Sequence, residues 1–502
     1  MDSIRPYHLS FVDIAIICVY MVGIVAMGCY FGRKNKSSAH FMIAEGKLPG
    51  WIVGLSLFGG YVSSISFLAN TGSAYSGNWS GWVYNLSLPI ATLVAIKWVI
   101  PYYRRKNVIS CFEPLEERFG LWARMYASVC FIVSETCRMG VILYLVTLPM
   151  NHLLGIQVAT LIKIIGVSVM AYTLIGGIEG VVYTDAMQAL ILLFGALACV
   201  VLIPLNTPGG FSEVIRVGMA NDKFRLGGLQ PDFVNTTFWV MIFMGFTLNL
   251  QSLSIDQNQI QRYVSARSEK EAKKSAWILA ILYVPAGALF FFMGTSLFVH
   301  YRLQPALLPE ALQVAGAGDK VLPYFIATGL PLGMAGIIIA AILAAAMSTL
   351  SSSLNVISSL ICEDYYKRFW RGVTEKGKMR VLRGGTALFG LIGIGVSLSL
   401  MHTESALRLQ WLLAGIFGGG ILGLFLISLV AYRIKNAAAF LGVVSGVLVI
   451  AYLTFSRMNF WPDFLPRYGL NELLTPVFGT AVVIIMGFLT TILIHHKQRK
   501  VK

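Results

Sequence analysis

Residues 50–67 have the sequence GWIVGLSLFGGYVSSISF. The stretch is apolar enough to lie in a bilayer, yet Gly59 and Gly60 stand in its middle and three serines follow them. Glycine weakens a helix interior by roughly 1 kcal/mol relative to alanine, so we expect the helix to break there. Helices broken near the bilayer midplane are typical of secondary transporters, where the unwound backbone binds ions or substrate. The stretch therefore predicts an interrupted membrane helix beside a binding site.

Apolar stretches of similar length recur along the whole chain. Of its 502 residues, 57% are hydrophobic and 12% are charged, whereas soluble proteins carry about 25% charged residues. Crossing a bilayer takes roughly 20 apolar residues. We therefore expect an all-α polytopic membrane protein with about 13 transmembrane helices. The predicted spans are 11–31, 50–70, 81–101, 124–150, 157–175, 184–204, 235–258, 273–299, 322–360, 383–400, 408–432, 436–455 and 473–496.

The formal net charge of +16 is spread unevenly over the loops between these spans. Most lysines and arginines fall on one side, in loops 32–49, 102–124, 261–275, 361–383 and 432–437 and in the tail 495–502. Basic loops stay in the cytoplasm, so we expect the N-terminus outside and the C-terminus in the cytoplasm. The charge then faces anionic membrane lipid, and no nucleic-acid partner is expected.

The order of the spans indicates an internal repeat. The seventh span, 235–258, is interrupted by Gly245 and by polar residues after it, and it lies five spans after 50–70. This spacing fits two inverted five-helix repeats. We expect 1–502 to be a single integral membrane domain, with repeats at about 50–204 and 235–432 and flanking helices at 11–31, 436–455 and 473–496.

The stretch AAAMSTLSSSLN at residues 344–355 carries most of the hydroxyl groups of the ninth span. Helical periodicity places Ala345, Ser348, Thr349 and Ser352 on one stripe. Sodium needs several oxygen ligands, which hydroxyls and backbone carbonyls can supply. The stretch therefore fits a sodium site facing the interrupted second span. It also fits a packing surface on which small residues only let helices approach closely.

Arg138 lies well inside the predicted span 124–150. An arginine at this depth is costly and usually faces a cavity or a partner. Its guanidinium can bind a substrate carboxylate through two parallel hydrogen bonds. It can equally pair with Glu135, which precedes it by three residues on the same helix face. Both interpretations stay open from the sequence.

Four runs together resemble the sodium:solute symporter family: residues 50–67, GGIEGVVYTD at 176–185, Gln261-Arg262-Tyr263, and 344–355. The resemblance covers essentially the whole chain. It implies a five-plus-five inverted-repeat (LeuT-like) transporter fold, Na⁺ as the only metal ion, and a place in a plasma membrane. Within the family the chain most resembles the bacterial sodium/sialic acid symporters, which implies the bacterial inner membrane.

The resemblance also implies residues for one or two sodium ions. The first site would consist of the carbonyls of Gly59, Val62 and Ala345 with the hydroxyls of Ser348 and Thr349. The second site would consist of Asp185, Ser348, Ser351 and Ser352. Family members commonly have alanine at position 59 and serine at 349, and both changes keep the oxygen. Asp185 also fits a first-turn carboxylate stabilised by a helix N-terminus, and the two roles are compatible.

A substrate site follows from the same resemblance. Arg138 matches an arginine that holds a substrate carboxylate, and Ser63 and Ser66 match positions that carry hydroxyls. The chain departs from the pattern at three further positions and at Glu135. Threonine, phenylalanine and glutamine are replaced by Tyr61, Gly81 and Asn85. We expect the loss of the aromatic ring to enlarge or reshape one wall, and Glu135 to orient Arg138 or accept a substrate ammonium.

We therefore expect a sodium-coupled symporter that imports a carboxylated sugar, with sialic acid first, by alternating access, and that works as a monomer. Import of a neutral sugar or a zwitterionic amino acid, and a solute sensor without transport, stay open. A channel is disfavoured because no filter-like loop occurs. An enzyme is disfavoured because the seven histidines lie in loops or at ends and the seven cysteines form no CxxC pair.

Overall fold

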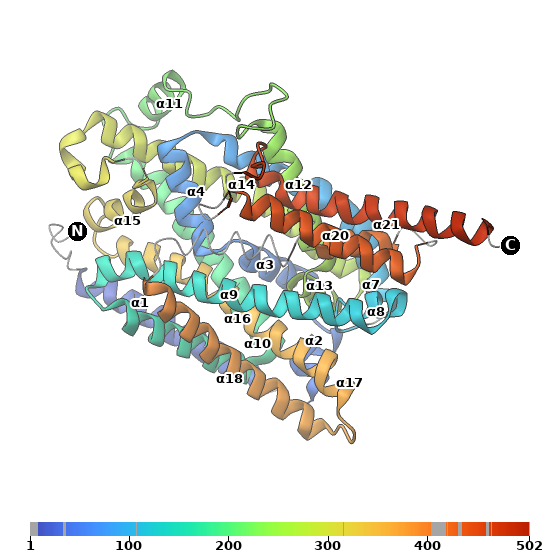
Figure 1. Cartoon of the computed structure of the whole chain (residues 1–502). Helices are drawn as coiled ribbons and strands as arrows, with labels where there is room; N and C mark the ends of the chain where they lie inside the picture. The colour runs from blue at the N-terminus through green and yellow to red at the C-terminus, as the bar shows by residue number, and fades with distance from the viewer. Residues whose placement is uncertain are drawn as a thin grey trace.

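The computed structural model describes residues 9–33, 37–106, 108–314, 316–402, 418, 420–429, 434–457, 461–462 and 464–500 (Figure 1). These residues form helices, and the β-type pairing among them is a single bridge between Leu48 and Ala266. The predicted all-α class is confirmed. The α-helices are α1 (Phe11–Gly32), α2 (Ser38–Ile43), α3 (Gly50–Tyr61), α4 (Ser64–Ser76), α5 (Val83–Leu86), α6 (Leu88–Val94), α7 (Ile100–Lys106), α8 (Glu113–Phe119), α9 (Leu121–Leu154), α10 (Val158–Leu205), α11 (Gly210–Ala220), α12 (Phe238–Ile255), α13 (Gln257–Ser265), α14 (Glu269–Leu303), α15 (Gly318–Thr328), α16 (Met334–Leu360), α17 (Lys367–Phe369), α18 (Glu375–Ser399), α20 (Asn436–Phe455) and α21 (Thr475–Lys500). Shorter 3₁₀ or π turns are η1 (Ala44–Gly46), η2 (Trp79–Trp82), η3 (Ala95–Val99), η4 (Pro305–Leu307), η5 (Glu310–Leu312), η6 (Ile361–Tyr366), η7 (Leu400–His402) and η8 (Glu472–Leu474).

The membrane spans follow the predicted pattern closely. In the part of the chain that the structure describes, ten helical segments are long and apolar enough to cross a membrane, and the bent pair α3–α4 makes an eleventh. Helix α10 contains two predicted spans, because it has 48 residues and its backbone leaves helical geometry at Gly177 (φ 55°, ψ −161°). The predicted span 408–432 lies mostly outside the described residues, apart from the short apolar helix Gly420–Leu429.

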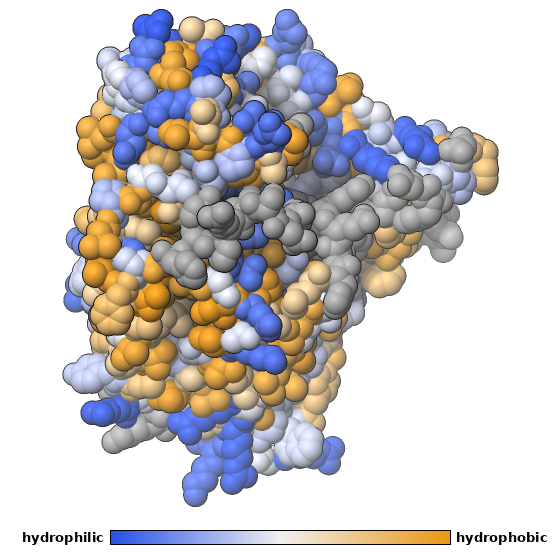
Figure 2. Space-filling model, turned by 90° about the vertical axis from the view of Figure 1, so that its left-hand side faces the viewer, coloured by the Kyte–Doolittle hydropathy of each residue, from blue (hydrophilic) through white to orange (hydrophobic). Residues whose placement is uncertain are grey.

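The long helices run between two ends of the molecule. Helices α11 and α15 lie toward the upper left of Figure 1, and α2, α8 and α17 lie toward the lower right. In Figure 2 hydrophobic residues dominate the middle of the visible face, and hydrophilic residues gather at its upper and lower edges. Large apolar side chains such as Val19 and Ile281 are 73% and 65% exposed. Such a surface suits a lipid environment rather than water.

Helix α16 is the central helix of the bundle. It packs against α1, α3, α9, α10 and α18, and nearly all of its side chains are buried. Its small residues allow this close packing. At Gly336 the backbone N–H donates to Asp13 Oδ1 on α1 over 2.8 Å. A Cβ added at Gly336 would lie 2.6 Å from the Asp13 carbonyl oxygen, so only glycine fits at this contact.

The second span is broken, as predicted. Helix α3 ends at Tyr61, Val62 and Ser63 are extended, and α4 begins at Ser64 with the two helices bent by 54°. The Ser63 hydroxyl caps α4 by accepting from the Ser66 N–H over 3.4 Å. Serine is a preferred N-cap, so the polar residues determine where the second half of the span begins.

Gly59 and Gly60 are themselves helical and serve a different purpose from the predicted one. A Cβ at Gly59 would lie 2.7 Å from the Asp185 carbonyl oxygen on α10, and one at Gly60 would lie 3.2 Å from the Arg262 guanidinium. The two glycines therefore allow α3 to approach its neighbours closely, and the chain unwinds just after them.

The seventh span is also broken, but not at the predicted residues. Helix α12 continues through Gly245, and the chain is extended at Asp256, where α13 begins. A Cβ at Gly245 would lie 2.8 Å from Ser87 Oγ, and Asn249 Nδ2 donates to the same oxygen over 2.9 Å. The prediction of a break around Gly245 was wrong, because that glycine and its polar neighbours serve helix packing.

The ninth span is shorter than predicted. The segment 322–360 divides into the end of α15 and the whole of α16, which starts at Met334. Gly333, with φ at +84°, separates them. A left-handed backbone of this kind favours glycine and ends helical geometry.

The broken spans are joined at one end of the bundle. The Leu48 N–H donates to the Ser265 carbonyl over 3.0 Å, and the Arg267 N–H donates to the Leu48 carbonyl over 2.9 Å. Glu271 caps the start of α3 by accepting from the Gly50 N–H over 2.6 Å. Helices α3, α13 and α14 are thereby linked through backbone atoms and one carboxylate.

The contact between α1 and α16 gives a test of the packing. Gly336→Ala places a methyl group against backbone, and overpacking of this kind costs about 1–3 kcal/mol. We expect the detergent-solubilised protein to unfold at a lower temperature. Gly384→Ala is the matched control, because a Cβ there meets nothing within 4 Å. Equal unfolding temperatures for the two variants would contradict the observed packing.

Candidate functional site

The hydroxyl-bearing face of α16 meets the last turn of α3 at the centre of the molecule. Ser348 Oγ lies 2.8 Å from the Gly59 carbonyl oxygen and 3.2 Å from that of Ala345, and Thr349 Oγ1 donates to the Ala345 carbonyl over 3.1 Å. Carbonyls in the last turn of a helix have no intrahelical partner. Val62 lies in the adjacent break and is buried. Four of the five residues predicted for the first sodium site are therefore joined by hydrogen bonds.

The residues predicted for the second sodium site also lie together. Asp185 on α10 is fully buried; its Oδ1 accepts from Ser351 Oγ and its Oδ2 from Ser352 Oγ, both over 3.2 Å. Each of these hydroxyls has one hydrogen, which it shares between Asp185 and the Ser348 carbonyl, whose oxygen lies 3.1 Å from Ser351 Oγ and 2.7 Å from Ser352 Oγ. Asp185 lies two helical turns beyond the break at Gly177, so the prediction of a first-turn carboxylate was wrong.

Arg262 is a buried partner of Asp185 that the sequence does not predict. It is 1% exposed, and its Nη2 lies 2.7 Å from Asp185 Oδ2 and also contacts Ser352 Oγ. Its Nε donates to Ser56 Oγ over 2.8 Å, and its Nη1 donates to the Asn258 carbonyl over 2.7 Å. The guanidinium neutralises Asp185, so a cation at the second site has to share that carboxylate. The sequence contains the Gln261-Arg262-Tyr263 run, but its periodicity does not predict which residue pairs with the arginine.

A cluster of polar side chains lies at one end of the hydroxyl-bearing face of α16. Gln261 Nε2 donates to Asn355 Oδ1 and Ser359 Oγ, each over 3.0 Å, and also to the Met42 carbonyl on α2. All four residues are buried. This contact joins α13, α16 and α2 at the end of the bundle that carries the basic loops.

Arg138 pairs with Glu135, as one of the two interpretations predicted. Its Nη1 lies 3.1 Å from Glu135 Oε1, and Glu135 Oε2 accepts from Ser353 Oγ on α16 over 2.5 Å. The Arg138 side chain is 28% exposed, whereas that of Glu135 is 5% exposed. One edge of the guanidinium therefore serves the ion pair, and its remaining N–H groups are accessible to a carboxylate ligand.

The other predicted substrate residues lie on α3, α4 and η2–α5. Tyr61 donates its hydroxyl to Asn249 Oδ1 on α12, and Ser63 Oγ lies 3.5 Å from Ser66 Oγ. Helix α4 packs against α9, the helix that carries Arg138. Among the described residues, no hydrogen bond joins Arg138 directly to this group, so the structure brings the helices together without joining the side chains.

The space beside Gly81 is filled rather than enlarged. A Cβ at Gly81 would lie 2.8 Å from Cζ of Phe291 on α14. The neighbouring Asn85 is buried, and a Cβ at Gly287 would lie 1.8 Å from its Nδ2. An aromatic ring from α14 thus packs against Gly81, which agrees with a reshaped wall and not with an enlarged one.

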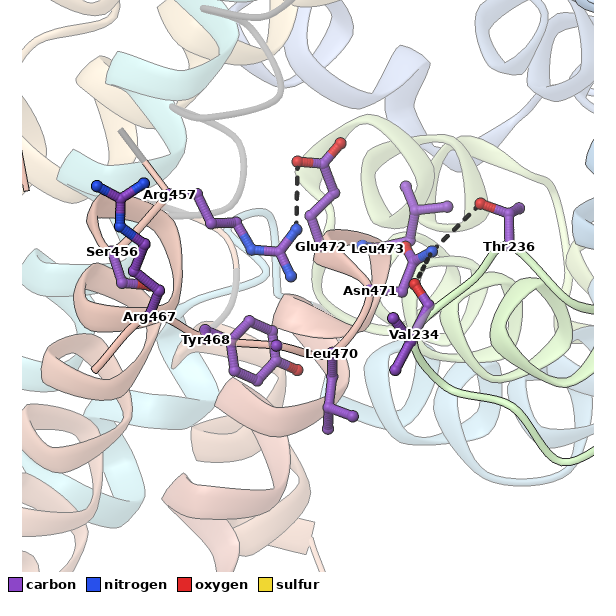
Figure 3. Close-up of a pocket in the computed structure, with 11 residues that line it drawn as sticks. Val234, Thr236, Ser456, Arg457, Arg467, Tyr468, Leu470, Asn471, Glu472 and Leu473 are labelled. Carbon is purple, nitrogen blue, oxygen red and sulfur yellow. Dashed lines mark hydrogen bonds and ion pairs between the residues drawn. The ribbon is translucent and has the colours of Figure 1, made fainter. Parts of the chain in front are cut away.

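A pocket of about 640 Å³ lies elsewhere, between the α20–α21 connection and the segment before α12 (Figure 3). Arg457, Arg467 and Tyr468 line one side, and Arg457 pairs with Glu472 over 3.6 Å. Asn471 Nδ2 donates to Thr236 Oγ1 over 3.2 Å. None of the predicted site residues lines this pocket. The buried oxygens of α3 and α16, rather than this hollow, are the candidate site.

Comparisons with known proteins agree with this arrangement. A family model described as the sodium:solute symporter family matches residues 41–446. The sodium/sialic acid symporter NanT of Aliivibrio fischeri is 33% identical over 476 residues, which cover 94% of this chain and 91% of the relative. The sodium/sialic acid symporter SiaT of Proteus mirabilis is 32% identical over 491 residues, which cover 96% and 95%.

Solved structures share the fold. A substrate-bound, outward-open Na⁺-coupled sialic acid symporter with a novel Na⁺ site superposes with a TM-score of 0.89 at 30% identity, covering 96% of this chain and 98% of its own. Mhp1, a nucleobase-cation-symport-1 family transporter, superposes with a TM-score of 0.57 at 14% identity, covering 90% and 94%. The predicted five-plus-five inverted-repeat (LeuT-like) transporter fold is confirmed, while the repeat boundaries at 50–204 and 235–432 stay a prediction.

The coupling between Asp185 and Arg262 can be tested by measuring the unfolding free energy of variants. Asp185→Asn leaves the Arg262 charge buried without its partner, which costs about 3–5 kcal/mol of unfolding free energy. We expect the double variant Asp185→Asn/Arg262→Gln to recover most of this loss in thermal unfolding. Glu269→Gln is the control: it breaks an exposed pair with Lys273, and such pairs contribute at most about 1 kcal/mol. Losses that simply add in the double variant would show that the two residues are not coupled.

Proposed function

The chain belongs to the sodium:solute symporter family, and from this premise we propose that it imports a carboxylated sugar of the sialic acid class together with sodium. The family consists of transporters, not enzymes. The observation that carries the proposal is the set of hydrogen-bonded oxygens that Gly59, Ala345, Ser348 and Thr349 form at a helix break. The similarity to two sodium/sialic acid symporters supports the substrate class.

The first sodium ion binds between α3 and α16. Hydroxyl and carbonyl oxygens suit a hard cation, and a neutral ligand set releases the ion more readily than a carboxylate does. The ion replaces the hydrogen bond from Ser348 to Gly59, and Val62, Ala345 and Thr349 complete its shell. Because it then bridges the broken span and the central helix, it stabilises the arrangement that receives substrate.

A second sodium ion binds at Asp185. The two carboxylate oxygens have different partners, since Oδ2 faces Arg262 and Oδ1 faces Ser351. The ion takes the Oδ1 side with the Ser348 carbonyl and the hydroxyl of Ser351, and the Ser352 hydroxyl turns from Oδ2 to the ion. Arg262 keeps the remaining oxygen and limits the affinity of this site.

The substrate carboxylate binds Arg138, and its hydroxyls contact the polar residues of α3, α4 and η2–α5, namely Tyr61, Ser63, Ser66, Gly81 and Asn85. Closure of the site and rocking of the repeats then release solute and ions on the other side. The protein works as a monomer in the bacterial inner membrane, in contact with lipid, with its N-terminus outside and its C-terminus in the cytoplasm.

The sodium gradient and the membrane potential together supply enough free energy to accumulate the solute. With two sodium ions and one anion, the net charge moved is +1. A potential of ~100 mV contributes about 2.3 kcal/mol per charge, and a tenfold sodium gradient adds roughly 1.4 kcal/mol per ion. The total of about 5 kcal/mol concentrates the solute about 10³–10⁴-fold.

Sodium-driven uptake of N-acetylneuraminic acid into proteoliposomes tests the ion site. Thr349→Val keeps the side-chain shape but removes an oxygen that would coordinate the ion. We expect this loss to cost about as much as a hydrogen bond to a charged group, about 1.5–3 kcal/mol. We expect the sodium concentration for half-maximal uptake to rise about 10- to 100-fold. Ser358→Ala is the control, because that buried hydroxyl only bonds back to Asn355 on the same helix. Accumulation without a sodium gradient would reject the symporter proposal.

Arg138→Lys tests the carboxylate contact. Lysine keeps the charge but cannot form two parallel hydrogen bonds, so we expect substrate affinity to fall about tenfold or more while the sodium requirement stays unchanged. Thermal stabilisation by sialic acid, uronic acids, hexoses and amino acids measures the effect. Stabilisation by a neutral hexose that survives the substitution would assign a neutral substrate instead, and binding without uptake would indicate a sensor.

A further inference from the structure

Ser353 lies on α16, which packs against α9, the helix that carries Arg138. Its Oγ donates to Glu135 Oε2 over 2.5 Å, and the other oxygen of this carboxylate, Oε1, lies 3.1 Å from Arg138 Nη1. Ser353 is fully buried, and the Glu135 side chain is 5% exposed. Three side chains on two helices therefore form a continuous chain of hydrogen bonds from the interior of the protein to Arg138.

The position of Ser353 on α16 connects this chain of hydrogen bonds to the helix of the proposed ion sites. Thr349 precedes Ser353 by four residues, and residues at this spacing lie on the same face of a helix. The hydroxyls of Ser351 and Ser352 contact Asp185 on α10, whereas that of Ser353 contacts α9. One helix thus directs hydroxyls both to the proposed sodium ligands and to the proposed substrate arginine.

The contacts of Glu135 leave one side of Arg138 open. Within the described part of the chain, a single hydrogen bond joins the two side chains, from Nη1 to Oε1. An arginine and a carboxylate frequently form two parallel hydrogen bonds, but here the second oxygen of Glu135 accepts from Ser353. The Arg138 side chain is 28% exposed, so its remaining N–H groups stay accessible to a ligand carboxylate.

We propose that Ser353 is a positioning residue for substrate binding, and that it acts by holding Glu135 away from a two-point contact with Arg138. Without the Ser353 hydroxyl, Glu135 Oε2 would be a buried acceptor with no donor, which is costly. The carboxylate then turns both oxygens to the guanidinium and competes with the substrate. This inference rests on the proposed function, in which Arg138 binds the substrate carboxylate, and it adds the residue that keeps the arginine available.

Removing the Ser353 hydroxyl tests the inference. Isothermal titration calorimetry in sodium buffer measures the binding of N-acetylneuraminic acid to the original protein and to Ser353→Ala. We expect the dissociation constant to rise about tenfold, because the substrate has to displace Glu135 from Arg138, while thermal stabilisation by sodium alone stays the same. Ser358→Ala is the matched control, because that buried hydroxyl donates to the Asn355 carbonyl on the same helix, and it should leave the dissociation constant within about twofold.

A double variant separates positioning from a loss of structure. Glu135→Gln leaves one acceptor oxygen in the side chain, so the side chain can no longer hold Arg138 through two oxygens. In this background we expect Ser353→Ala to change the dissociation constant by less than about twofold. A loss of affinity that persists in the double variant, or a loss of sodium stabilisation in Ser353→Ala that accompanies the loss of substrate binding, overturns the inference.

Ser353→Cys keeps the test decisive if Ser353→Ala does not fold. A thiol is close to a hydroxyl in size but is a weak donor, so we expect a smaller loss of affinity in the same direction, about threefold. Binding as tight as in the original protein overturns the inference. Sodium-driven uptake by the original protein is scored separately: if N-acetylneuraminic acid accumulates and no Ser353 variant weakens its binding, only this inference fails, and if no sugar acid accumulates, the proposed function fails.

Discussion

The buried ion pair between Asp185 and Arg262 is the interaction on which the arrangement of the central helices depends. Its atoms belong to α10 and α13, and the same guanidinium reaches Ser56 on α3 and Ser352 on α16. Four helices thus meet at one charged group in a region that excludes water. A buried charge without a partner is strongly unfavourable, so α10 and α13 cannot separate while both charges stay buried. In any movement of these helices the two residues must either stay together, or another cation must pair with Asp185.

The two proposed ion sites differ in the charge of their ligands, and both suit an ion that must bind and leave in each transport cycle. The first is built from neutral oxygens at the end of α3, where unwinding exposes carbonyls that no helix partner occupies. The second has a full carboxylate, but Arg262 already neutralises it. Neither site offers an unpaired negative charge that would hold an ion permanently. Weak, shared ligands are what a transporter needs if ions must leave as well as enter.

Much of the fold could be predicted from the sequence, because bilayer thickness determines how long an apolar helix must be. Helix α9 (Leu121–Leu154) and the predicted span 124–150 differ mainly at their ends. The position of a helix break was harder to predict. A glycine that allows close helix packing and a glycine at an unwound turn look alike in sequence, and Gly245 is one that allows close packing. The resemblance predicted residues for the proposed ion sites, and the structure brings most of them together. The resemblance did not identify the partner of Arg262, which lies 77 positions away along the chain.

The Gln261 side chain adds a constraint on how the molecule opens. An amide nitrogen has two hydrogens, yet this one serves Met42, Asn355 and Ser359. At least one of its hydrogens is therefore shared between two acceptors, and each bond from a shared hydrogen is weaker than a bond with its own hydrogen. Water that reaches this point can satisfy all of these groups at once. An opening of the bundle on the side of the basic loops would therefore exchange these hydrogen bonds for bonds with water.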